Sequence, residues 1–71
     1  MLKYKFIEDR MEGALYEFYP EGNVKSPGIV LLKDGEGKII TKSEDDVGNR
    51  YAFHAIRGID RSTKEGTVAW Y

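Results

Sequence analysis

Two stretches near the start of the chain alternate apolar and polar side chains with the period of two that a half-buried β-strand requires. In residues 2–8 (LKYKFIE), Leu2, Tyr4 and Phe6 fall on one side while Lys3 and Lys5 fall on the other. Residues 14–19 (ALYEFY) repeat the pattern after a short turn region. The sequence therefore predicts an antiparallel pair of strands.

A second hairpin is predicted further along the chain. The runs GIVLLK (28–33) and KIIT (38–41) are short and apolar, and the intervening DGEG supplies glycines that tolerate a tight connection. Before them, YPEGN (19–23) and KSPG (25–28) contain the proline and glycine residues that mark changes of chain direction.

A helix is predicted to begin at Ser43. The motif SEDD offers Ser43 as the N-cap with Asp46 three residues later, and acidic residues are favourable in the first turn of a helix. Two glycines are candidates for its end, Gly58 as an early stop and Gly66 as a C-cap. The final TVAWY (67–71) alternates again and predicts a fifth strand.

The expected fold class is α+β, with a single domain over residues 1–71. The elements follow the order β-β-β-β-α-β, and they form a mostly antiparallel sheet of about five strands with one helix packed across one face.

Composition excludes several classes of protein. The chain of 71 residues has no Cys and one His, so it lacks the usual ligands for disulfide or zinc stabilisation, and we expect no cofactor, no metal and no enzymatic activity. It has no signal-peptide pattern and no apolar run of membrane-spanning length. We therefore expect a cytoplasmic protein without a membrane contact.

The predicted helix sorts apolar and basic residues onto opposite sides. Tyr51, Ala52, Ala55, Ile56 and Ile59 form one arc. The opposite arc contains Arg50, His54, Arg57 and Arg61. Three interpretations stay open for this basic arc: a solvated helix surface, a site for an acidic protein partner, or phosphate contacts. The net charge of −1 makes nucleic acid the weakest of the three.

Apolar residues exceed what one helix can cover. The run IVLL (29–32) places apolar side chains on both faces of the sheet, so the sheet either closes into a barrel or meets another chain. A homodimer or a protein partner is the favoured hypothesis. The candidate contact residues are of types enriched at interfaces: Tyr19, Leu32, Trp70 and Tyr71.

The chain resembles short uncharacterised bacterial proteins in four short segments: YPEGN, the following PG, the HA of the predicted helix and the terminal GTVAWY. That resemblance implies a bacterial setting and no particular activity. The leading functional hypothesis is a small non-enzymatic protein-interaction or self-associating domain, and the alternative is a nucleic-acid-binding domain that uses the basic arc. A third hypothesis, small-molecule binding or catalysis, requires a concave site into which both Tyr51 and His54 project.

Overall fold

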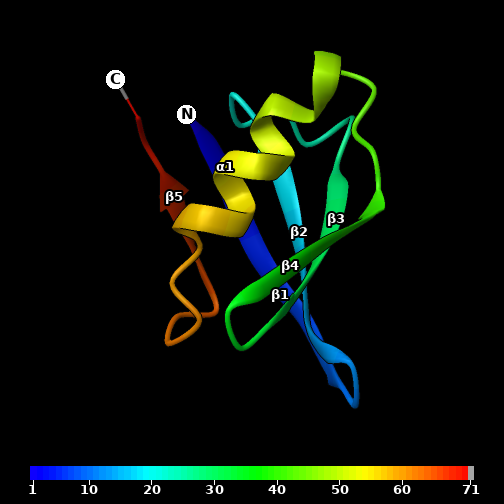
Figure 1. The fold of residues 1–71 in the computed structure, drawn as a ribbon. Helices are drawn as coiled ribbons and strands as arrows, with labels where there is room; N and C mark the ends of the chain where they lie inside the picture. The colour runs from blue at the N-terminus through cyan, green and yellow to red at the C-terminus, as the bar shows by residue number, and fades with distance from the viewer. Residues whose placement is uncertain (71) are drawn as a thin grey trace.

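The computed structural model describes residues 1–70, and these form five strands and one α-helix (Figure 1). The order β-β-β-β-α-β and the α+β class are confirmed. A 3₁₀ turn, Val47–Asn49, precedes the helix. The elements are β1 (Leu2–Arg10), β2 (Gly13–Pro20), β3 (Gly28–Lys33), β4 (Glu36–Thr41), α1 (Arg50–Gly58) and β5 (Glu65–Val68).

All neighbouring strands are antiparallel, in the spatial order β4-β3-β2-β1-β5. The last strand of the chain returns to the first, with Leu2 opposite Val68. In the described part of the chain β4 and β5 remain the two edges, so the sheet is open and not a barrel. A register shift between Phe6 and Glu8 interrupts the β1–β2 pairing.

The core lies between α1 and the face of the sheet that α1 crosses in Figure 1. The inward arc of α1 contributes two small residues, Ala52 and Ala55, which let the helix approach the strands closely. Their partners on the sheet are Leu2, Tyr4, Ala14, Tyr16, Phe18, Val30, Leu32 and Val68. The alternation seen in the sequence therefore selects the buried face correctly on β1 and β2.

The prediction that the helix begins at Ser43 is wrong, because α1 begins at Arg50. The Ser43 hydroxyl donates to the Ser26 carbonyl and accepts a hydrogen bond from the Asp45 backbone N–H, which ties two loops together. Asp46 is the residue that caps the helix. Its Oδ1 and Oδ2 accept hydrogen bonds from the backbone N–H groups of Tyr51 and Ala52, at 2.8 and 2.9 Å.

The helix ends at Gly58, the earlier of the two predicted stops. The N–H of Ile59 donates to the carbonyl of Ala55 and closes the last turn. Gly66 lies inside β5 and is not a C-cap. The last strand begins two residues earlier than predicted and ends at Val68, so Trp70 follows it, and Tyr71 lies outside the described residues.

Candidate functional site

The structure divides the four residues of the predicted basic arc between two pockets: Arg50 and His54 line one, and Arg57 and Arg61 line the other. Arg50, His54 and Arg57 lie on α1, whereas Arg61 follows the end of the helix. Its Nη1 makes an ion pair with Oδ1 of Asp34 at 3.3 Å. The basic arc is therefore split between these two pockets, with Arg57 and Arg61 together on either side of the helix end at Gly58.

A hollow lies beside the first turns of α1, and we call it the Trp70 hollow. Both Tyr51 and His54 line it, which meets the geometric requirement of the third sequence hypothesis. Its volume is about 270 Å³. The lining residues come from the loop before the helix, from α1 and from the chain after β5: Asp45, Val47, Arg50, Tyr51, His54 and Trp70.

Three aromatic rings form one wall of the Trp70 hollow. The His54 and Trp70 rings are stacked, with centroids 3.8 Å apart and planes 4° from parallel. The Tyr51 ring meets Trp70 edge to face at 5.4 Å. Edge-to-face and stacked pairs add stabilisation beyond the area that they bury, so these contacts hold the residues after β5 against the helix.

A hydrogen bond to Glu21 holds the Tyr51 side chain in place. The Tyr51 hydroxyl donates to Glu21 Oε2 at 2.8 Å, and the same oxygen accepts from the Met1 ammonium at 2.7 Å. The ammonium and then the hydroxyl lower the pKa of Glu21 from its ordinary value. The hydrogen bond to Glu21 in turn raises the pKa of Tyr51, because the phenol donates in its neutral form.

The opposite face of the sheet has no helix on it within residues 1–70, and we call it the open face. Its centre consists of five residues that the register places on the same side: Leu15, Glu17, Tyr19, Ile29 and Leu31. Leu15 is only 5% exposed, although no helix of the described chain covers it. Its cross-strand neighbours, Glu8 and Leu31, flank it directly. The apolar side chains that the sequence predicts on this face are thus partly buried by their neighbours within the sheet.

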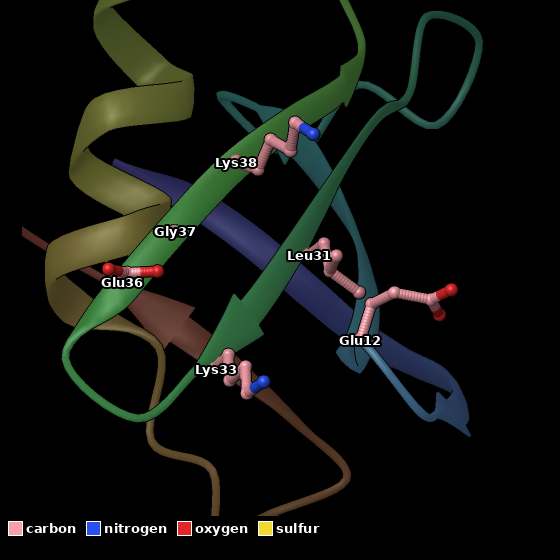
Figure 2. Close-up of a pocket in the computed structure, with 6 residues that line it drawn as sticks. All are labelled: Glu12, Leu31, Lys33, Glu36, Gly37 and Lys38. Carbon is pink, nitrogen blue, oxygen red and sulfur yellow. The ribbon is translucent and has the colours of Figure 1, made fainter.

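Charged side chains surround that centre and leave two depressions. One, of about 510 Å³, is lined by Glu12, Lys33 and Lys38 around Leu31. In Figure 2 the Leu31 side chain extends toward that of Glu12, which comes from the β1–β2 turn. The other depression, of about 350 Å³, is lined by Lys3 and Lys5 of β1, by Tyr19 and Val24, and by residues of β5.

Tyr19 is half-buried within the open face. Its hydroxyl donates to Glu17 Oε2 at 3.2 Å. Burial, and then the nearby Glu17 carboxylate, raise the pKa of this phenol above its ordinary value. The phenol therefore stays neutral and keeps its donor through the physiological range.

The four predicted contact residues lie in different places. Tyr19 is on the open face, and Trp70 lies against α1 on the other side of the sheet. Leu32 belongs to the core and is 4% exposed, so it offers almost no surface to a partner. Tyr71 lies outside the described residues. Sequence reasoning missed Asp45, Val47 and Glu21, whose places depend on loops that carry no periodic pattern.

Among residues 1–70, no three side chains of metal-binding type converge on one point. No helix in the same range is long and apolar enough to cross a bilayer. No protein family, curated protein or solved structure matches the chain. The bacterial resemblance drawn from the sequence thus stays a prediction.

Proposed function

We propose that this protein is a small non-enzymatic interaction domain that self-associates through the open face of its sheet. The observation that carries the proposal is the exposure of that face. Ile29, Leu31 and Tyr19 are half-buried in the isolated chain, and no helix in residues 1–70 packs over them. Aromatic side chains are enriched at protein contact surfaces, and the one carboxylate among these residues, Glu17, accepts the hydrogen bond of Tyr19.

The charges around the open face favour a second copy over a strongly charged partner. Basic and acidic side chains alternate across neighbouring strands, as in the pairs Lys5–Glu17 and Lys33–Glu36. A surface with both signs interspersed attracts neither a polyanion nor a polycation. In a two-fold dimer the same patch meets itself, so each copy offers the other both signs.

Nucleic-acid binding, the alternative from the sequence, has less support. Arg61 is paired with Asp34, and His54 has its ring against Trp70. Arg50 and Arg57 are then the exposed cations left on the helix, and two cations supply little of the phosphate neutralisation on which such binding depends.

The proposed setting is the cytoplasm of a bacterium. The absence of Cys is consistent with a reducing compartment. The bacterial assignment depends on the resemblance of YPEGN, PG, HA and GTVAWY to segments of bacterial proteins. Both parts of this setting are inferred from the sequence.

Sedimentation equilibrium over a wide range of protein concentration tests the proposed function. We expect the wild-type chain to shift from monomer to dimer as concentration rises. Leu31→Glu places a charge at the centre of the open face, opposite Leu15 and Lys38, and is expected to leave a monomer at every concentration.

Phe53→Glu is the matched control. Phe53 is 53% exposed on α1, on the other side of the sheet, so this variant is expected to dimerise like wild type. Circular dichroism checks that both variants fold. A wild-type chain that stays monomeric at the highest concentration overturns the proposal, and a shift of DNA or RNA mobility abolished by Arg57→Glu replaces it with the alternative.

A further inference from the structure

The Trp70 hollow has walls that are fixed before any ligand arrives. Trp70 packs against both His54 and Tyr51, and the Tyr51 hydroxyl is anchored by Glu21. Binding to a site that is already ordered avoids the cost of immobilising side chains. The hollow therefore has the character of a formed site, at a volume just below the usual range for ligand pockets.

Two opposite charges line this hollow. The Asp45 carboxylate is oriented by the side-chain amide of Asn23, which donates to Oδ2 at 2.6 Å. Arg50 is exposed, and none of the ion pairs among residues 1–70 includes it or Asp45. The guanidinium and the carboxylate thus line the same hollow without an ion pair to each other, and a ligand with one charge alone leaves one of them without an opposite charge.

We propose that the Trp70 hollow binds a free α-amino acid with an aromatic side chain. The ligand carboxylate contacts the Arg50 guanidinium, the ligand ammonium contacts the Asp45 carboxylate, and its ring packs against Trp70 and Val47. Each charged group of the ligand meets the opposite charge, since guanidinium and carboxylate pairs form strong charge-assisted hydrogen bonds. The apolar wall of the hollow favours an aromatic ring on the ligand, because aromatic groups pack favourably on the indole of Trp70.

The protein contains its own reporter for this site. Trp70 is its one tryptophan, so fluorescence excited where tyrosine does not absorb comes from the wall of the hollow alone. L-phenylalanine is the probe, with 3-phenylpropionate and 2-phenylethylamine as analogues that lack the ammonium and the carboxylate. We expect L-phenylalanine to change the emission with saturation, and each analogue to bind about tenfold more weakly.

Charge-neutral substitutions separate the two contacts. Arg50→Gln is expected to weaken the binding of L-phenylalanine about tenfold and to leave the affinity for 2-phenylethylamine unchanged, because that analogue has no carboxylate. Asp45→Asn is expected to weaken the binding of L-phenylalanine by the same factor and to leave the affinity for 3-phenylpropionate unchanged, because that analogue has no ammonium. Arg57→Gln and Glu44→Gln are matched controls, because both residues are exposed and neither lines the hollow. Both controls should bind L-phenylalanine like wild type.

Three results overturn the proposal. The first is no saturable change in Trp70 emission, together with no shift of its indole N–H resonance, on addition of L-phenylalanine. The second is an analogue that binds as tightly as the amino acid, which assigns the hollow to a singly charged ligand. The third is equal weakening by Arg50→Gln and Arg57→Gln. The oligomeric state plays no part in this readout, so the test is independent of the proposed self-association.

Discussion

At the scale of single residues, Asp60 stabilises the turn that follows α1. Its Oδ1 accepts hydrogen bonds from the Ser62 hydroxyl at 2.6 Å and from the Ser62 N–H at 2.9 Å. The hydroxyl first, and then the N–H, lower the pKa of this carboxyl below its ordinary value of 3.8. Such local bonds from side chain to backbone are typical of Asp in turns.

This lowered pKa predicts a pH dependence. Below pH 3.8 the unfolded chain binds more protons at Asp60 than the folded chain does, so the stabilisation is present above that value and is lost as pH falls through the folded pKa. Asp60→Asn is expected to remove this part of the acid dependence. Urea denaturation of wild type and variant on both sides of pH 3.8 measures the difference.

Ser62→Ala provides the control for Asp60. It removes the hydroxyl donor and keeps the backbone N–H, so it should weaken the acid dependence without abolishing it. Parallel pH profiles for wild type and Asp60→Asn would contradict the prediction.

At the scale of elements, α1 depends on its cap. A helix of nine residues is too short to be stable alone, and its first N–H groups need acceptors. Asp46 supplies both carboxylate oxygens from four residues before Arg50. The turn that brings it there contains Gly48 and Asn49 at φ 71° and 60°.

Replacing Asp46 by Ala is therefore expected to lower the free energy of unfolding by about 1–2 kcal/mol, because two backbone donors lose their acceptors. One of them, the N–H of Ala52, is buried. Chemical denaturation followed by circular dichroism measures the loss. Glu44→Ala, an exposed carboxylate of the same loop, should change stability by less than about 0.5 kcal/mol. Equal effects of the two variants would refute the role of Asp46.

The strands were predictable because their signal is local, whereas the helix start was not. Alternation in residues 2–8 and 14–19 reflects burial on one side of a sheet, and the short turn between these two strands then sets how they pair. Ser43 and Asp46 both fit a capping pattern. The two residues have different roles because the Ser43 hydroxyl donates a hydrogen bond to the carbonyl of Ser26, which lies 17 residues earlier in the chain.

At the scale of the whole molecule, α1 packs closely against the edge of the sheet because Gly37 has no side chain. α1 touches all five strands, and Ile56 packs over Gly37 on the edge strand β4. A Cβ at Gly37 would meet the Ile56 side chain at less than contact distance. Close approach of helix and edge strand therefore requires glycine here.

Gly37→Ala is expected to destabilise the fold by about 1–3 kcal/mol, because the added methyl forces the helix or the edge strand to move. In an Ile56→Ala background the same change should cost less, because the obstructing side chain is gone. A double-mutant cycle from chemical denaturation measures this coupling. Additive effects of the two substitutions would show that Ile56 is not the obstacle.

The candidate site was less predictable than the fold. Helical spacing assigns Tyr51 and His54 to opposite arcs of the helix, yet both side chains line the Trp70 hollow. The third ring, Trp70, reaches His54 only because β5 pairs beside β1 and returns the chain to the helix. Sequence patterns report neighbours within an element and carry no signal for such a meeting between elements.

The pairing of Leu2 with Val68 has a consequence for the order in which the protein folds. The strands β1, β2, β3 and β4 are neighbours in the order of the chain, so this meander forms through short connections. The contact between β1 and β5 joins residues far apart in the sequence and closes a much longer loop. Until β5 pairs, the outer edge of β1 has unpaired backbone groups, and in that interval two folding chains are most exposed to mispairing with one another.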